Sequence, residues 1–105
     1  TYSVTLADTE AARALAARLP LTLSMTELNG NEKYANLDQA LPTAATQPGE
    51  IHTGDLMLYG ADCLVLFYAD FTTAYSYTPL GRLVDPTGLA AALGTGGVTV
   101  TLTAN

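Results

Sequence analysis

The sequence predicts a mainly β domain, a β-barrel with two short helices, and three observations lead to this prediction. The residues from Gly54 to Phe71 form the most apolar run of the chain. The two ends of the chain carry matching alternating patterns, and only two short segments between them show helical spacing. At 105 residues, the chain has the length of one domain, residues 1–105, with a single core.

The apolar run is interpreted as two buried strands joined by a tight turn. Residues 56–59 precede the turn Gly60-Ala61-Asp62, and residues 63–68 follow it. Apolar runs of about four to eight residues bounded by Gly and Asp are typical of strands that are buried on both faces. We therefore expect both strands at the centre of the sheet.

The first third of the chain predicts a strand, a helix and a hairpin. The strand carries Tyr2, Val4 and Leu6 in alternation. The helix is predicted to begin at an Asp8 N-cap and to end at Pro20. Its buried face has the spacing i, i+3, i+4, i+7 and consists of Ala12, Leu15, Ala16 and Leu19. A strand through Leu21, Leu23 and Met25 then leads to the Asn29-Gly30 turn and to a second strand through Tyr34.

The remaining segments predict less regular structure and a closing strand. Residues 38–53 are expected to form an irregular connection, and residues 72–77 a short edge strand or a loop, with Pro79 excluding a central strand. A short helix is predicted from an Asp85 N-cap and Pro86, with Gly94 at its end. The last strand, Val98, Val100 and Leu102, mirrors the first. We therefore expect Val4 and Val100 to face one core in a closed barrel whose ends the helices cover.

Composition and single residues exclude several function classes. Ten acidic residues against four basic ones give a net charge of -6, which repels a phosphate backbone, so nucleic acid is not expected as a ligand. No apolar run reaches the roughly 18 residues of a membrane helix.

Cys63 is interpreted as a small buried hydrophobe, and His52, near Glu50 and Asp55, as a solvated loop histidine. We predict no metal site and no cofactor. Because Thr1 already opens on a strand pattern, an export signal, an anchor or a further domain could precede it, and the compartment stays open.

Five short motifs resemble one protein family, in the right order and over nearly the whole chain. They are NGNEKY (Asn29 to Tyr34), Pro48-Gly49-Glu50-Ile51, Gly54-Asp55 with Tyr59, the apolar run ending in Phe67-Tyr68, and YTPLGRLVD (Tyr77 to Asp85). This set resembles the small bacterial cyclophilin-like fold proteins, which are reduced relatives of the cyclophilin β-barrel. The resemblance implies a cyclophilin-like closed barrel of uncharacterised function, and a flavodoxin-like protein as an associated partner.

The resemblance also allows a test for peptidyl-prolyl isomerase activity. Cyclophilins use an arginine, a pocket histidine and a pocket tryptophan. Leu80-Gly81-Arg82-Leu83 resembles their Phe-Gly-Lys-Val segment, and counting back from Gly81 places Tyr77 where they carry the histidine. The chain has no tryptophan and no arginine between Leu19 and Gly81. The sequence thus argues against isomerase activity.

The tyrosines indicate a binding site. The chain has six tyrosines against two phenylalanines, and several of them follow the apolar hairpin. Tyrosine is a common strand residue, but phenol rings also line binding grooves. We therefore expect a non-catalytic module that binds a peptide, a partner protein or a small molecule, the alternatives being an isomerase with an altered active site and a purely structural scaffold. The predicted groove consists of Lys33, Tyr59, Phe67, Tyr75 and Tyr77.

Overall fold

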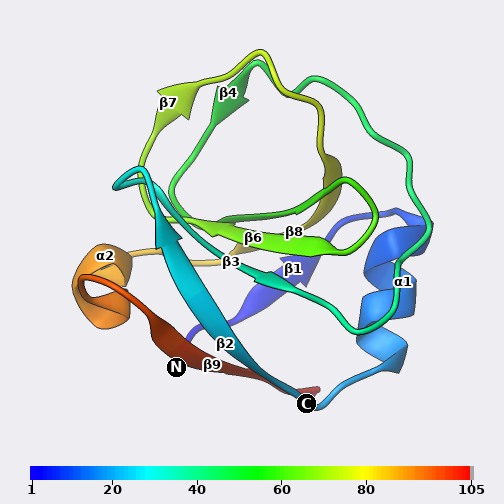
Figure 1. Ribbon diagram of the computed structural model, residues 1–105, viewed down its shortest axis with the longest axis horizontal. Helices are drawn as coiled ribbons and strands as arrows, with labels where there is room; N and C mark the ends of the chain where they lie inside the picture. The colour runs from blue at the N-terminus through cyan, green and yellow to red at the C-terminus, as the bar shows by residue number, and fades with distance from the viewer. Residues whose placement is uncertain (105) are drawn as a thin grey trace.

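The computed structural model describes residues 1–104 and shows a mainly β protein with two short helices (Figure 1). The helices are α1 (Glu10–Ala17) and α2 (Leu89–Leu93). The strands are β1 (Val4–Leu6), β2 (Leu21–Leu28), β3 (Glu32–Asn36), β4 (Glu50–Ile51), β5 (Asp55–Tyr59), β6 (Cys63–Phe67), β7 (Phe71–Thr72), β8 (Thr78–Leu83) and β9 (Val98–Leu102). A curled seven-stranded sheet has the order β1-β8-β5-β6-β3-β2-β9, and β4 and β7 form a separate two-stranded ribbon.

The curled sheet does not close into the predicted barrel. β1 pairs with β8 and β9 pairs with β2, and within the described residues neither strand has a partner on its other side. The two terminal strands do lie in one sheet, but at its opposite edges. Val100 packs partly against the core, whereas Val4 is 38% exposed. The prediction that both valines face one core is therefore wrong for Val4, and the sheet is a half-barrel.

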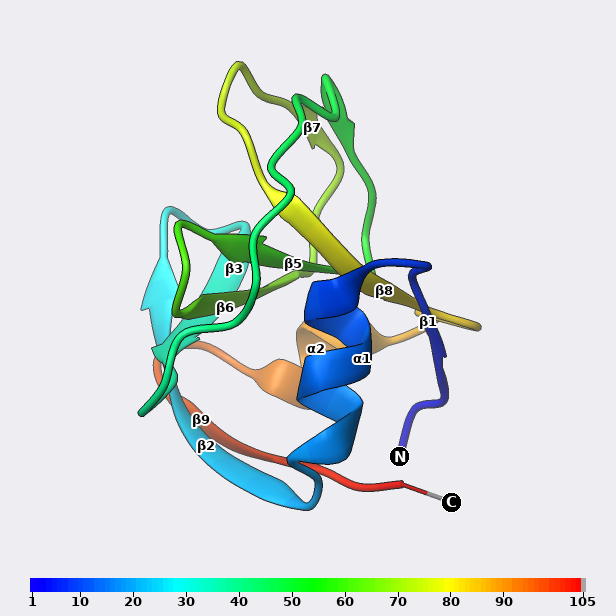
Figure 2. The ribbon, with the colours of Figure 1, turned by 90° about the vertical axis from the view of Figure 1, so that its right-hand side faces the viewer.

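Helix α1 explains why the sheet stays open, because it lies between the two edges (Figure 2). Its buried residues Ala11, Ala12 and Leu15 cover apolar surface that a closing strand pair would otherwise cover. A cavity of about 460 Å³ remains between the N-terminal segment, α1 and β9, with Leu19 and Leu102 in its wall. β1 has only three residues, so closure would add few backbone hydrogen bonds.

The predicted central hairpin is confirmed. β5 and β6 pair antiparallel from Leu56 opposite Leu66 to Tyr59 opposite Cys63, and they lie in the middle of the sheet. Gly60 opens the turn with a φ of 63°, a left-handed conformation that favours glycine. The β2–β3 hairpin is also confirmed, with positive φ at both Asn29 and Gly30, as the Asn-Gly pair predicts.

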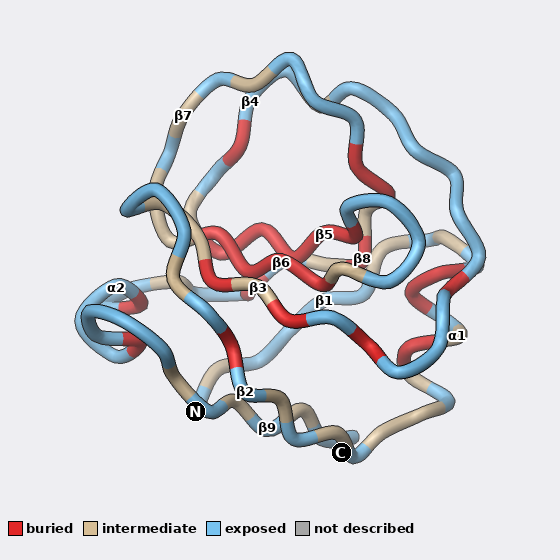
Figure 3. Tube along the Cα trace, viewed as in Figure 1, coloured by how far each residue is buried: buried red, intermediate tan, exposed pale blue. Residues whose placement is uncertain are grey.

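Strands β5 and β6 are buried along most of their length (Figure 3), and alternate side chains of β3, β5 and β6 belong to clusters on opposite faces of the sheet. One face, which we call the main core, contains Ala11, Leu15, Met25, Ala35, Leu37, Leu41, Leu56, Leu58, Leu64, Leu66, Leu80, Leu83, Leu89 and Leu93. The other face, the second cluster, contains Ile51, Met57, Val65, Phe67 and Tyr77, with Tyr34, Cys63 and Phe71 partly buried against them. The sheet curls around the main core, and the β4–β7 ribbon stands on the side of the second cluster (Figure 1).

Both helices begin later than predicted. Thr9, and not Asp8, caps α1: its hydroxyl accepts a hydrogen bond from the Ala12 N–H at 3.1 Å and donates one to the Pro79 carbonyl at 2.8 Å. The second bond ties the helix to β8, which Asp8 could not do. Asp85 does not cap α2 but accepts hydrogen bonds from Thr87 in the preceding turn. The buried Leu89 and Leu93 and the terminal Gly94 of α2 are as predicted. Neither helix in residues 1–104 is long and apolar enough to cross a membrane.

Two strands were not predicted from the sequence: the short β4, which lies within residues 38–53 that were expected to be irregular, and the longer β8. Pro79 was expected to exclude a central strand, yet β8 lies between β1 and β5. The β5–β8 pairing shifts register between Leu56 and Met57, beside Pro79, and β1 pairs only with residues 81–83 of β8. The proline therefore lies where the ladder is irregular and has a neighbour on one side only, so its missing N–H costs little.

Candidate functional site

Five aromatic side chains form a continuous row on the second-cluster face. The ring centroids of Tyr75 and Tyr59 are 6.1 Å apart, and those of Tyr59 and Tyr77 are 5.6 Å apart. Phe67 continues the row at 5.5 Å from Tyr77 and at 5.5 Å from Phe71. These separations, with edge-on or tilted planes, are those of attractive aromatic pairs. We call Tyr75, Tyr59, Tyr77, Phe67 and Phe71 the aromatic row.

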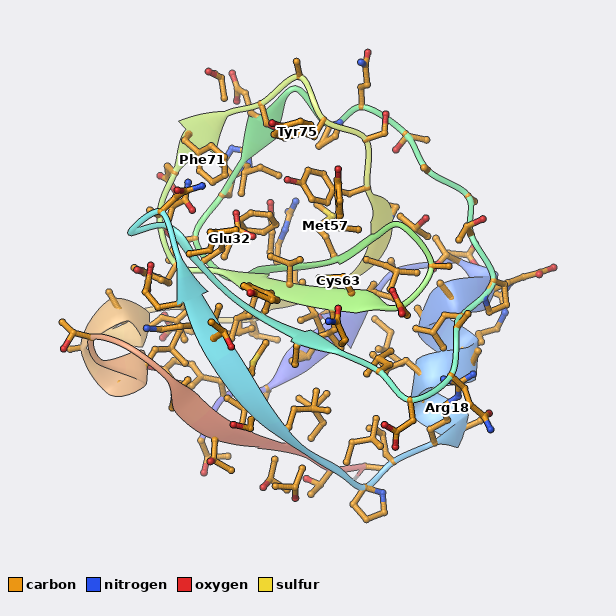
Figure 4. The ribbon with its side chains drawn as sticks, in the orientation of Figure 1. Arg18, Glu32, Met57, Cys63, Phe71 and Tyr75 are labelled. Atoms are coloured by element: carbon orange, nitrogen blue, oxygen red, sulfur yellow. The ribbon has the colours of Figure 1, made fainter. Side chains whose placement is uncertain are left out.

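Several elements build the aromatic row. Tyr59 ends β5, Phe67 ends β6 and Phe71 begins β7, while Tyr75 and Tyr77 come from the segment that leads into β8. Figure 4 shows Phe71 and Tyr75 on the side of the β4–β7 ribbon, and Glu32, Met57 and Cys63 on the side of the central strands.

Exposure differs strongly along the aromatic row. Tyr75 is 65% exposed and Tyr59 is 48% exposed, whereas Tyr77 and Phe67 are buried. The buried Tyr77 thus supports Tyr59 directly, and Tyr75 contacts the row through Tyr59. Four of the five predicted groove residues, Tyr59, Phe67, Tyr75 and Tyr77, are therefore brought together, and Phe71 is a neighbour that the sequence reasoning did not name.

Lys33, the fifth predicted residue, does not join the aromatic row. Its side chain is fully buried and points to the main-core face of β3. Its ammonium group lies 3.0 Å from Glu27 Oε1 and donates to the carbonyls of Gly94 at 2.9 Å and Gly96 at 2.6 Å. The same group lies 5.3 Å from the ring centroid of Tyr68. Lys33 thus ties the β2–β3 hairpin to the end of α2, and it does not stand at the rim of a groove.

Glu27 and Tyr68, which are both partly exposed, complete the network around the buried Lys33. The Tyr68 hydroxyl donates a hydrogen bond to the same Glu27 oxygen that accepts from Lys33. The bonds from Tyr68 and Lys33 lower the pKa of Glu27. The bond to the carboxylate raises the pKa of Tyr68 to about 12. Each polar group in the network has a partner, as a buried cation requires.

Glu32 is the charged residue on the face of the aromatic row that the sequence reasoning missed. It precedes Lys33 on β3, so its side chain points to the opposite face, and it stands opposite Phe67 in the β3–β6 ladder. Among residues 1–104 it takes part in no ion pair. Desolvation, and then the charge of Glu27, raise the pKa of Glu32. The alternation of β3 was the available signal: if one of two successive charged residues is buried in the core, the other faces the second cluster.

Cys63 and Tyr77 lie within reach of the Glu32 charge. Burial is the main reason that the pKa of the Cys63 thiol is raised, with smaller contributions from Asp62 and Glu32. Burial, followed by the charge of Glu32, likewise raises the pKa of Tyr77. A thiol with a raised pKa is a poor nucleophile at neutral pH. The surroundings of Cys63 therefore do not activate it.

The polar residues around His52 have structural roles. Asp55 is buried and accepts hydrogen bonds from the His52 backbone N–H at 2.9 Å and from Arg82 Nε at 3.3 Å. His52 Nε2 lies 3.6 Å from Glu50 Oε2 and Nδ1 lies 3.9 Å from Asp55 Oδ2. Nowhere in residues 1–104 do three or more His, Cys, Asp or Glu side chains gather as metal ligands would.

Two cavities lie away from the aromatic row. One, of about 530 Å³, is lined by residues of β2, of the end of β3 and of the segment after it, with Arg18 at its edge. The other is the cavity of about 460 Å³ between the sheet edges. Neither contains any of the five predicted groove residues. Within the aromatic row, Tyr59 and Tyr75 form the open, exposed end, whereas Tyr77 and Phe67 are buried.

Comparison with known proteins places this architecture in a family. The family model described as "Cyclophilin-like family" matches residues 1–103. The chain therefore belongs to the cyclophilin-like family, as its motifs and its curled mainly β sheet indicate. No curated protein and no solved structure matched the chain.

Proposed function

We propose that this cyclophilin-like domain is a non-catalytic binding module whose ligand is a peptide segment, free or part of a partner protein. The aromatic row carries the proposal. Tyr59 and Tyr75 expose large aromatic surfaces, and Tyr59, which packs on the buried Tyr77, in turn contacts Tyr75. Aromatic residues on rigid supports are typical anchors of binding surfaces, since they offer contact area at little cost in conformational entropy.

The shape of the surface favours a peptide over a small molecule. Small-molecule sites are mostly enclosed, whereas Tyr59 and Tyr75 at the end of the aromatic row are exposed to solvent. Successive ring centroids are 5.5 to 6.1 Å apart. An extended chain advances by roughly 6.6 Å every two residues, and alternate side chains point to the same side. Alternate side chains of an extended peptide can therefore contact Tyr75 and Tyr59, the two exposed rings of the row, whose centroids are 6.1 Å apart.

Chemical-shift perturbation tests the binding proposal. We expect a library of extended hexapeptides to shift resonances of Tyr59, Tyr75 and their neighbours. Tyr75→Ala combined with Tyr59→Ala should weaken binding roughly 30-fold or more, the effect of losing about 2 kcal/mol at a binding hot spot. Arg13→Ala is the matched control, because Arg13 lies on α1 and pairs only with the exposed Asp8 among the described residues. Shifts confined to the face that carries Arg13 and Arg18 would contradict the proposal.

Membership of the cyclophilin-like family makes prolyl isomerisation the second candidate function. The chemistry of that reaction, set against the residues of this chain, argues against it. Stabilising the twisted prolyl amide needs a cationic donor aimed at the nitrogen, and one such donor contributes roughly 10² to 10³ in rate. Lys33 is buried, and its ammonium group already donates to Glu27 and to the carbonyls of Gly94 and Gly96. Arg82 is bound to Asp55 on β5. We therefore expect no acceleration of Xaa-Pro isomerisation above background in a protease-coupled assay. Turnover that disappears in Arg82→Ala would contradict this expectation.

A further inference from the structure

Glu32 gives the aromatic row a negative charge that no ion pair within residues 1–104 neutralises. Glu32 stands directly across from Phe67, a member of the row, and its side chain shares a face with Tyr34 and the second cluster. It is partly buried. A carboxylate that has lost part of its hydration without gaining an ion pair or a hydrogen bond is energetically unfavourable.

Lys33 and Arg82, the two cationic side chains on the strands of the described chain, both have partners elsewhere. Lys33 follows Glu32 but points to the opposite face, where Glu27 and two carbonyls hold it. Arg82 lies three strands away in the sheet order and is bound to Asp55. The groups that do act on Glu32 or respond to its charge are Glu27 from β2, Cys63 from β6 and Tyr77 before β8. None of these three is a cation. The row thus presents aromatic faces and one unpaired carboxylate.

We propose that the aromatic row binds an extended peptide through a lysine or arginine side chain, whose cation lies against the aromatic rings and pairs with Glu32. This inference rests on the proposed function and specifies the chemistry of the ligand. Cations are attracted to the faces of tyrosine and phenylalanine rings, and more strongly where water is partly excluded. A charge-assisted hydrogen bond to Glu32 adds to this attraction. The net charge of -6 favours encounters with basic peptides and disfavours acidic ones.

The proposal includes a pH dependence with a definite sign. Glu32 must be ionised to pair with the cation, and burial raises the pKa of Glu32 above its ordinary value of 4.5. Binding of a basic peptide therefore weakens as the pH falls through this raised pKa, while the lysine or arginine of the peptide stays charged. The pairing in turn lowers the pKa of Glu32, so binding below neutral pH releases protons.

Calorimetry with a matched set of peptides tests the proposal. The peptides are acetylated and amidated hexapeptides that differ at one central position, which is lysine, arginine, norleucine or glutamate. We expect the lysine and arginine peptides to bind about tenfold more tightly than the norleucine peptide, the effect of one hydrogen bond to a charged group. In Glu32→Gln, the affinity of the lysine peptide should fall to that of the norleucine peptide and lose its pH dependence. Glu10→Gln on α1 is the control and should change neither.

The outcomes separate this inference from the proposed function. Equal binding of the lysine and norleucine peptides, with shifts along the aromatic row, would overturn the inference and leave the binding module in place. A lysine preference that persists in Glu32→Gln would also overturn it, by placing the recognition at another acidic residue. If none of the four peptides shifts the NMR resonances of the aromatic row, the proposed function itself is overturned. Unchanged backbone resonances in unliganded Glu32→Gln show that the variant keeps its fold.

Discussion

Strands β5 and β6 are buried on both faces and β3 on one face only, and the two faces of the sheet are packed with different residue types. The main core consists of leucine, alanine and methionine, with tyrosine only at its margin. The second cluster carries both phenylalanines of the chain together with Tyr34 and Tyr77. The aliphatic face is enclosed by the curled sheet and both helices, whereas the aromatic face has the narrow β4–β7 ribbon above it (Figure 1). The aromatic face is thus the one from which rings reach solvent.

The charged residues Glu32 and Lys33 also differ between the two faces of the sheet. They are neighbours on β3, so the pleat sends one to each face. On the aliphatic face, Lys33 is fully buried and all its donors are directed at oxygen acceptors. On the aromatic face, Glu32 keeps no ionic partner among the described residues. A charge that is fully partnered serves the fold, and a charge left unpartnered is available for a ligand.

The largest effect on stability is expected at Phe67, the most deeply buried ring of the aromatic face. Phe67 is fully buried and contacts both Tyr77 and Phe71. Phe67→Ala should lower the free energy of unfolding by about 3 to 5 kcal/mol, as for other buried phenylalanines. Urea unfolding measures this loss. Tyr75→Ala is the control: because Tyr75 is 65% exposed, its stability should change by less than about 0.5 kcal/mol. Similar losses for both would mean that the whole row is structural.

The next effect concerns the charge on the aliphatic face. Lys33→Met keeps the length of the side chain but leaves Glu27 and the carbonyls of Gly94 and Gly96 without their donor. We expect a loss of about 3 kcal/mol, because removing one partner of a buried ion pair is costly. A double-mutant cycle with Glu27→Leu should show a coupling energy of about 1 kcal/mol or more. Additive losses would mean that the pair contributes nothing to stability.

Alkaline titration provides a smaller and more local test of the same network. The folded-state pKa of Tyr68 is raised to about 12 from 10.0, so the folded protein holds this proton more tightly than the unfolded chain does. Its contribution to stability is complete below pH 10 and is lost as the pH rises through about 12. NMR with ¹³Cζ-labelled tyrosine should resolve this late titration. In Glu27→Gln it should move back toward 10, and a wild-type Tyr68 that titrates with the exposed tyrosines would contradict the network.

The smallest effect on stability is expected at Glu32. Because its carboxylate is partly desolvated and unpaired, Glu32→Gln should change the free energy of unfolding by less than about 0.5 kcal/mol, or raise it slightly. Thermal and urea unfolding at neutral pH measure the change. The contrast with Lys33→Met is the informative quantity. A loss of several kcal/mol in Glu32→Gln would show that Glu32 has a structural partner and is not free for a ligand.

The sequence by itself determined the elements whose signals are local. The apolar run around the Gly60 turn, the Asn29-Gly30 hairpin and the alternation from Val98 to Leu102 each specify a strand within a few residues, because pleat and turn geometry depend on neighbouring positions. The clustering of Tyr59, Tyr75 and Tyr77 was also predictable, since these residues are close in sequence and flank buried strands. The family motifs gave the fold class for the same reason.

Only the tertiary structure decided how distant segments meet. Whether the sheet closes depends on what fills the gap between its edges, and α1 fills it, so the half-barrel could not be read from the two matching ends. β8 tolerates Pro79 because a register shift lies beside it and β1 does not reach it. The placement of Lys33 in the main core and of Glu32 on the aromatic face depends on which face of β3 the sheet curls around. That choice is made by packing between residues far apart in the chain, because burial is a property of the assembled sheet and not of any one strand.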